Sequence, residues 1–196
     1  MITKPLHRGF FTIMDEYLDI TDAKGNFTGQ KELKSIVHQK GLYHHTAHIW
    51  LYTQNKEILL SQRSALKTIC PLMWDVSVAG HVDAGESIMD GALREMKEEI
   101  GLTLNKKDLK KIGVFECFQN YDNGIKDYEF HNTFIAELKV PLSKLKPQET
   151  EVESLKLVFF SEFENLLKHS ETNRHFVASN RPYYHTILNS IKSIFP

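Results

Sequence analysis

A group of acidic residues lies in the stretch GHVDAGESIMDGALREMKEEIGL, residues 80–102. On a helix with 3.6 residues per turn, Glu95, Glu98 and Glu99 stand at i, i+3 and i+4 and share one face. Ordinary acidic surface helices also carry three glutamates, but like charges at this spacing repel one another. A cation would hold them together, and hard oxygen ligands suit Mg²⁺ or Mn²⁺. The stretch therefore predicts a divalent metal site.

The element that must position these carboxylates is a helix over residues 87–100. Ser87 is a good N-cap residue, and Asp90 three positions later imitates a capping box. Gly101 stands where the residue after a helix commonly takes a positive φ. The apolar stripe that can dock this helix on a sheet consists of Ile88, Ala92, Met96 and Ile100.

A longer pattern of fixed spacing surrounds the glutamates and reads G-x5-E-x7-R-E-U-x-E-E-x-G-U, where U is apolar. Its positions are filled by Gly80, Glu86, Arg94, Glu95, Met96, Glu98, Glu99, Gly101 and Leu102. Common residues occur at roughly 5–7% per position, so seven fixed positions coincide by chance at about 10⁻⁹ per starting point. The pattern resembles the signature box of the Nudix hydrolases, with every position filled.

The resemblance implies a fold, an activity and a set of roles. The fold would be an α/β/α sandwich with a mixed sheet, in which the box forms a loop–helix–loop. The activity would be hydrolysis of a diphosphate linked to another moiety, usually in a nucleoside-diphosphate derivative, with Mg²⁺ or Mn²⁺ as cofactor. The ligands of that ion would be Glu95, Glu98 and Glu99. The box geometry would depend on Glu86 and Arg94, which can pair, and on Gly80 and Gly101, which would allow its turns.

The flanks narrow the resemblance to one branch of the family. The stretches GLYHHTAHIWLY and ICPLMWDVSVAGHVDAGES are similar to isopentenyl-diphosphate isomerase, which places a catalytic cysteine just before a glycine-histidine pair. Here Ala79 stands at that position and has no proton to give, and the box is complete where the isomerases have a degenerate one. Both departures favour hydrolysis. An isomerase-like enzyme and a non-catalytic nucleotide-binding regulator are the two alternatives.

Other isomerase positions match only in part. Arg63 and Lys67, four residues apart after a strand, align with residues that contact the diphosphate, although an exposed pair would look the same. The isomerases also hold a second metal with histidines and acids, and Asp127 and Glu129 would share one face of a strand. The matching residues for the second metal are His38, His44 or His45, His81, Asp127 and Glu129. With ten histidines in the chain, such matches also arise by accident.

The general base that would activate water is left open by the sequence. A box glutamate, Glu129, or an acid of the loop that carries Glu149, Glu151 and Glu153 could serve, although plain solubility is the simpler explanation of that loop. A base needs hydrogen-bond reach to the attacking water, which a sequence does not give. Cys70, Trp50 and Trp74 are expected to be apolar packing residues.

The bulk properties fit one compact domain that binds a small molecule. The chain has 196 residues, 41% of them hydrophobic, with a formal net charge of −1 and two cysteines. This composition gives no basic footprint for a nucleic-acid polymer or a membrane surface, and no disulfide framework. We expect a single domain over residues 1–196, with 1–14 left unassigned, that acts in the cytoplasm on a small-molecule diphosphate. A homodimer is compatible with the family resemblance.

Hydrophobic periodicity predicts a mixed α/β sandwich and not a doubly wound sheet. A hairpin is expected over residues 16–30, turning at 23–26. The further strands are expected over residues 45–52, 58–64, 74–80, 110–120, 128–139 and 155–161, the last preceded by an acidic loop over 147–154. The helices besides 87–100 are expected over residues 31–39 and 162–169 and within 178–194.

Overall fold

The computed structural model describes residues 15–170, Phe176 and residues 181–196; the unassigned residues 1–14 lie outside this range. The strands are β1 (Tyr17–Thr21), β2 (Phe27–Leu33), β3 (His44–Tyr52), β4 (Glu57–Arg63), β5 (Trp74–Asp75), β6 (Val78–His81), β7 (Lys110–Asn120), β8 (Lys126–Glu137) and β9 (Val152–Phe159). The helices are α1 (Lys34–Lys40), α2 (Ile88–Ile100), α3 (Phe160–Lys168) and α5 (Arg181–Lys192).

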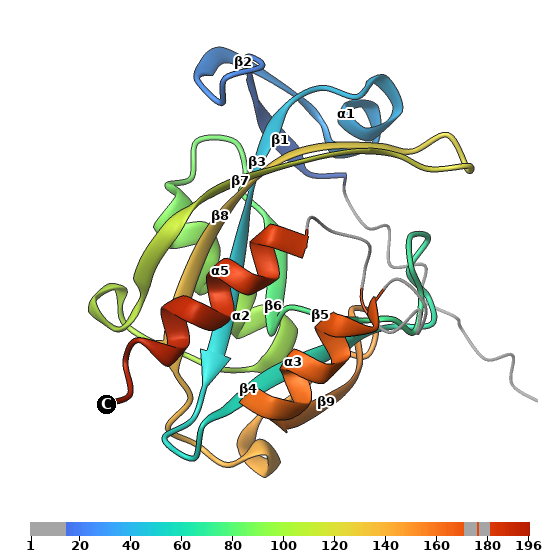
Figure 1. Ribbon diagram of the computed structural model, residues 1–196. Coiled ribbons are helices and arrows are strands. Elements are labelled where there is room, and N and C mark those ends of the chain that lie inside the picture. The colour runs from blue at the N-terminus through green and yellow to red at the C-terminus, as the bar shows by residue number, and fades with distance from the viewer. Residues whose placement is uncertain (1–14, 171–175, 177–180) are drawn as a thin grey trace, which may run out of the picture.

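Strand β3 is the centre of a mixed sheet. It runs parallel to β8 over nine paired residues, from His44↔Glu129 to Tyr52↔Glu137, and antiparallel to β6, from Thr46↔His81 to Ile49↔Val78. Strands β7 and β8 form a long curved hairpin beside it (Figure 1). The pairing therefore brings residues near 44, 81 and 129 to one end of three neighbouring strands.

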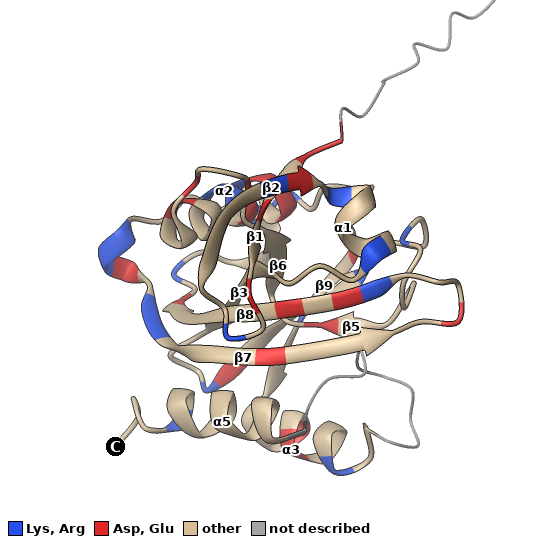
Figure 2. Ribbon diagram, turned by 90° about the horizontal axis from the view of Figure 1, so that it is seen from above, with Lys and Arg blue, Asp and Glu red and all other residues tan. Residues whose placement is uncertain are grey.

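Helices cover both faces of this sheet, and β3 is therefore buried on both faces. Ala47, Ile49 and Leu51 point into one hydrophobic cluster, which α2 closes. Trp50 and Tyr52 alternate with them and point into a second cluster, which α3 and α5 close. Figures 1 and 2 show these two helix layers on opposite sides of the strands. The mixed α/β/α sandwich expected from the sequence is confirmed.

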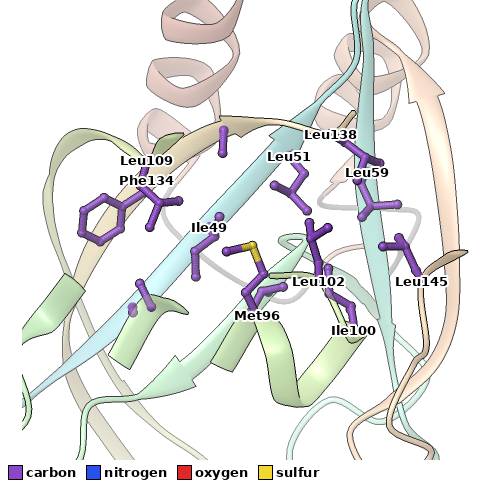
Figure 3. Packing of buried hydrophobic residues seen from close by; sticks show 14 of the residues in the cluster. Ile49, Leu51, Leu59, Met96, Ile100, Leu102, Leu109, Phe134, Leu138 and Leu145 are labelled. Carbon is purple, nitrogen blue, oxygen red and sulfur yellow. The ribbon is translucent and has the colours of Figure 1, made fainter. Parts of the chain in front are cut away.

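Helix α2 docks through the predicted apolar stripe. Ala92, Met96 and Ile100 are fully buried, and Ile88 packs against the same cluster. Figure 3 shows Met96 facing Ile49 of β3, with Ile100 beside Leu102 in the same cluster. Burying a side chain of this size contributes about 1.5–3 kcal/mol. Core packing therefore fixes the rotation of α2 about its axis, and with it the direction in which its acidic residues point.

The strand predicted over residues 74–80 is wrong, because two short strands occupy it. Strand β5 pairs with β4, whereas β6 pairs with β3, so the chain changes partner at Val76 and Ser77. Buried Ser77 joins the two diverging partners: its hydroxyl donates to the Leu59 carbonyl at 2.6 Å and accepts from the Leu51 amide at 2.9 Å. Periodicity along one segment does not reveal such a change of partner.

Two predicted element boundaries are also wrong, and sheet pairing explains both. Residues 31–33, assigned to a helix from the sequence, extend β2 because they pair with β1. Strand β9 begins at Val152, inside the expected acidic loop, because Val152 pairs with Arg63 of β4. The hairpin of β1 and β2 and the helix over 88–100 follow the predictions.

Acidic and basic residues are interspersed along the described elements (Figure 2). Neither Cys70 nor Cys117 forms a disulfide, and Cys70 is half-buried, not the buried packing residue expected from the sequence. Trp50 is fully buried in the second cluster, as expected, whereas Trp74 packs against its edge. Among the described helices, none combines the length and apolar character needed to cross a bilayer.

Candidate active site

A cavity of about 860 Å³ opens beside the end of β3 where β6 and β8 flank it. Most of the residues singled out in the sequence line it, although they come from α1, α2 and four strands or loops. Those residues are His38, Arg63, Lys67, Gly80, His81, Glu95, Glu98, Glu99, Asp127 and Glu129. His45 is not among them: its Nε2 faces the Gly25 carbonyl at 3.1 Å, on the other side of β3.

Helix α2 is held at both ends as predicted. The Ser87 side chain caps its first turn by accepting from the Asp90 amide at 3.2 Å. Gly101 ends the helix in the left-handed region, with φ 69°. A Cβ at Gly101 would also lie 2.9 Å from Cβ of Lys146. Conformation and space both favour glycine at this end.

Arg94 joins the box loop to the helix. Its guanidinium donates to Glu86 Oε2 and to the His81 carbonyl, each at 2.9 Å, and to Glu95 Oε1 at 2.8 Å. Burial would lower its pKa, but the hydrogen bond to Glu86 and the charge of Glu95 outweigh that effect and raise the pKa. Arg94 therefore stays charged and fixes the box loop to the helix. The predicted pair with Glu86 is present.

Gly80 has a different role from the predicted one. It lies within β6 without a positive φ, so it makes no special turn. Instead, the Glu95 side chain packs directly against it, and a Cβ at this position would lie 2.0 Å from Cδ of Glu95. The glycine is required because a carboxylate crosses the strand where any side chain would collide with it.

Glu95, Glu98 and Glu99, here called the carboxylate cluster, all line the cavity but differ in exposure. The Glu98 side chain is 54% exposed, the Glu95 side chain is 14% exposed, and Glu99 is buried. Burial raises the pKa of Glu95 to about 7, and burial with the charge of Glu95 raises the pKa of Glu99 well above its usual range. Carboxyls held together at this energetic cost suit a divalent cation, whose charge would offset it.

Three histidines and one glutamate converge where α1 meets the ends of β3, β6 and β8, and all except His44 line the cavity. His38, His44, His81 and Glu129 are here called the imidazole centre. Nε2 of His38 lies 3.2 Å from Nε2 of His81. When neither of these two nitrogens carries a proton, no hydrogen bond joins them. Glu129 Oε1 lies 3.5 Å from Nε2 of His44 and 3.6 Å from Nε2 of His81. One ligand atom from each of the four side chains lies within 4.8 Å of the others, close enough for all four to bind one ion.

The hydrogen bonds around the imidazole centre prepare its nitrogens for a metal. Nδ1 of His38 and Nδ1 of His44 donate to the carbonyls of Lys34 and Leu42, at 2.7 and 2.9 Å. A carbonyl only accepts, so the ring proton sits on Nδ1 and the lone pair is on Nε2. Burial also lowers the pKa of His38 and of His81, which favours the neutral ring that binds metals.

Among the described atoms of this region that are buried without a hydrogen-bond partner are Nε2 of His44 and Oδ1 of Asp127. Buried polar atoms are normally satisfied, and both would be satisfied by an ion at the imidazole centre. Asp127 lies 3.5 Å from Nε2 of His38. Burial and the charge of Glu129 raise the pKa of Asp127 to about 7. The residues present therefore fit a transition metal, which accepts imidazole and carboxylate together.

His48, His131 and Glu129 are also close enough to suggest a further ion, but their geometry argues against it. The rings of His48 and His131 stack, with centroids 3.8 Å apart and planes 26° apart. A metal lies in the plane of each imidazole that binds it, and two stacked rings do not share such a point. Nε2 of His131 instead contacts Glu129 Oε2 at 2.9 Å.

The two predicted phosphate ligands line the cavity, and each already has an acidic partner. Arg63 ends β4, with its guanidinium 3.5 Å from Asp75, and its Nε donates to the Ile69 carbonyl at 3.0 Å. Lys67 follows in the next loop and pairs with Glu151. Among Glu149, Glu151 and Glu153, only Glu151 lines the cavity. Part of the loop assigned to solubility therefore faces the candidate site.

Several cavity residues were missed by the sequence reasoning. Lys34 lines the cavity and pairs with Glu16 at 2.9 Å; its signal was its position four residues before His38 on a helix. His131 follows Glu129 on the same strand face, a period-2 signal that was available. Asp75 and Tyr121 carried no local signal, because a partner change and a hairpin tip place them.

Comparisons with known proteins agree with this architecture. The family model described as NUDIX domain matches residues 42–179. The chain is 34% identical over 158 residues to Nudix hydrolase 3 of Arabidopsis thaliana, covering 78% of this chain and 20% of that protein. The chain therefore spans about a fifth of the length of that relative.

A second relative belongs to the other branch. The chain is 32% identical over 133 residues to isopentenyl-diphosphate Delta-isomerase 2 of Photorhabdus laumondii, covering 67% of this chain and 73% of that protein. Among solved structures, the MutT protein of Methanosarcina mazei superposes with a TM-score of 0.58 at 18% identity, covering 76% of this chain and 96% of that one. That likeness concerns the fold alone.

Proposed function

The chain belongs to the Nudix family, and from that premise we propose that it hydrolyses a diphosphate linkage in a small molecule of the nucleoside-diphosphate type. The observation that carries the proposal is the convergence of Glu95, Glu98 and Glu99 on one cavity. A regulator that only binds nucleotides has no need to gather three carboxylates at a cost in free energy. A hydrolase of diphosphates does, because its substrate and its transition state are both strongly anionic.

The carboxylate cluster would hold Mg²⁺ or Mn²⁺, and the imidazole centre would hold a transition metal. A cation in the carboxylate cluster would neutralise phosphate charge and lower the pKa of the attacking water. The rest of the polar wall belongs to the chain itself. Arg94 keeps the cluster in place and is saturated by its acceptors, so we assign it a positioning role and no direct contact with phosphate.

Three cations of the cavity are the proposed phosphate ligands. Arg63, Lys67 and Lys34 each rest on a carboxylate, and a diphosphate offers the same acceptor geometry with more charge. On binding, substrate would take Lys67 from Glu151 and leave that side chain without its cation, near Glu99. Glu151 is thereby the loop acid best placed to accept the proton of the attacking water, beside the alternatives Glu98 and Glu129.

A screen of diphosphates tests the proposal. The purified chain is incubated with nucleotide sugars, dinucleotides, oxidised nucleotides and short diphosphates, with Mg²⁺ or Mn²⁺ and with chelator, and phosphate-containing products are quantified. Release from at least one nucleoside-diphosphate compound, abolished by chelator, is expected. Equal release in Mg²⁺ and in chelator would refute the role of the cation.

The imidazole centre and the isomerase relatives favour one second candidate, an isomerase acting on isoprenyl diphosphates. Such an enzyme needs a proton donor facing Glu129, and Ala79 supplies none. The only cavity thiol among the described residues belongs to Cys117, which is the strand partner of Glu129 and so lies beside that acid on the same face. Deuterium exchange into isopentenyl diphosphate in heavy water, without product release from any nucleotide, would favour this candidate over hydrolysis.

A further inference from the structure

The carboxylate of Glu129 is divided between two environments. Its Oε1 faces the imidazole centre, 3.5 Å from His44 and 3.6 Å from His81, whereas its Oε2 is engaged by Nε2 of His131 at 2.9 Å. A glutamate side chain that is free to rotate would present either oxygen, or neither, to an ion. The contact with His131 removes this freedom, because His131 is 6% exposed and lies on the same strand face.

His131 is in turn held in place by residues that are not proposed as ligands of either metal. Its ring stacks on His48, with centroids 3.8 Å apart. Nδ1 of His48 is hydrogen-bonded to the hydroxyl of Tyr183 at 2.9 Å, and that hydroxyl also accepts from Nε1 of Trp50 at 2.8 Å. All four rings are nearly or fully buried. Successive contacts through His48 and His131 therefore link Tyr183 of helix α5 to Oε2 of Glu129.

We propose that His131 is a positioning residue for the metal of the imidazole centre, and that His48 and Tyr183 extend this support to α5. The inference rests on the proposed binding of an ion at that centre. Hydrogen-bonded partners of metal ligands typically change metal affinity by about 10–100-fold when they are lost. His131 supplies that partner for Glu129, as the backbone carbonyls of Lys34 and Leu42 do for two of the histidines.

The test measures metal binding by the full chain and does not depend on turnover. Co²⁺ is titrated in saturating Mg²⁺, which fills oxygen sites, and the visible absorption of nitrogen-ligated Co²⁺ reports the imidazole centre. The variant His131→Phe keeps a ring to stack on His48 but removes the donor to Glu129. Its Co²⁺ affinity is expected to fall about 10–100-fold, with a changed absorption band because Glu129 is no longer fixed.

Three further variants make the result specific. His131→Gln, which can still donate to Glu129, is expected to recover part of the affinity. Tyr183→Phe removes only the hydroxyl that holds His48, so a smaller loss is expected, a few-fold. His185→Ala on the exposed side of α5 is the matched control, since it deletes an imidazole far from the centre, and its Co²⁺ titration should equal that of the wild type.

The outcomes separate this inference from its premise. If the wild type binds one Co²⁺ that His44→Ala no longer binds, the imidazole centre is established. Wild-type affinity and spectrum in a folded His131→Phe protein would then overturn the positioning role. Should His131→Phe fail to fold by circular dichroism, His131→Leu, which also lacks a donor, takes its place, and wild-type affinity and spectrum in that folded variant would overturn the role instead. Wild-type protein that takes up no Co²⁺ would end the premise and this inference together.

Discussion

The carboxylate cluster and the imidazole centre share one cavity and meet at Gly80 and His81, yet they are built in opposite ways. The carboxylate cluster comes from two consecutive turns of α2, offers only oxygen atoms as ligands and keeps Glu98 half exposed. The imidazole centre is assembled from α1, β3, β6 and β8, offers mostly nitrogen and is nearly enclosed. One is a local feature of the chain, and the other exists only in the folded sheet.

This difference would suit two kinds of metal ion in one cavity. An all-oxygen cluster with one exposed member, Glu98, suits Mg²⁺, which keeps several waters and is exchanged readily, often together with phosphate. An enclosed nitrogen-rich centre suits an ion of the transition series that stays bound. We therefore expect the carboxylate cluster to govern turnover and the imidazole centre to retain its ion between turnovers.

The largest expected effect comes from removing one exposed carboxylate. Glu98→Gln keeps the shape of the side chain but not its charge, so turnover should fall by about three orders of magnitude, or ~4 kcal/mol in activation free energy. The fold should survive because Glu98 packs in no core. Product release and circular dichroism are measured beside Glu162→Gln, an exposed glutamate of α3. Wild-type turnover in Glu98→Gln would show that the carboxylate cluster is not the catalytic part of the cavity.

A smaller loss is expected from one methyl group at the junction of the two sites. Gly80→Ala would put its Cβ 2.0 Å from Cδ of Glu95, so the carboxylate must move. Turnover is expected to fall about 100-fold, ~3 kcal/mol. Gly113→Ala on β7 is the control, because its Cβ would meet only ordinary contacts at 3.4 Å. Equal kinetics for both variants would mean that Glu95 need not lie against β6.

The pH dependence of stability provides a third test, made without metal. The pKa of Glu95 is raised to about 7 by burial, so its stabilising contribution is present below its unfolded pKa and is lost as pH rises through about 7. The loss is at most about 3 kcal/mol. In chelator, raising the pH from about 5 to about 8.5 should therefore lower the free energy of unfolding of the wild type more than that of Glu95→Gln. Parallel pH curves for the two proteins would contradict the raised pKa.

The smallest expected effect compares the two lysines of the cavity. Lys67 lies near Glu99, whereas Lys34 lies near His38 and His81 and also near Glu95, as their influence on the pKa values of those groups indicates. If the diphosphate binds on the side of the carboxylate cluster, Lys67→Met should raise KM about tenfold, ~1.4 kcal/mol, and Lys34→Met should raise it less. The reverse order in steady-state kinetics would move the diphosphate to the imidazole centre.

The same contrast explains what the sequence predicts and what it does not. Glu95, Glu98 and Glu99 are predictable because a helix fixes neighbours at i, i+3 and i+4, and Asp127 and Glu129 because a strand alternates. The role of Gly80 was mistaken, since its partner Glu95 reaches it only through the packing of α2 on β6. The change of strand partner at Ser77 and the contact of His48 with Tyr183 likewise depend on distant segments, which local periodicity does not encode.

Hydrolysis in water enriched in ¹⁸O tests the central claim most directly, with the diphosphate that the screen identifies. If the carboxylate cluster serves cleavage of a P–O–P linkage by water, one ¹⁸O should enter a phosphate product per turnover in Mg²⁺, and the rate of incorporation should fall to background in chelator and about 1000-fold with Glu98→Gln. Cleavage that continues in chelator, or products free of label at phosphorus, would contradict the account.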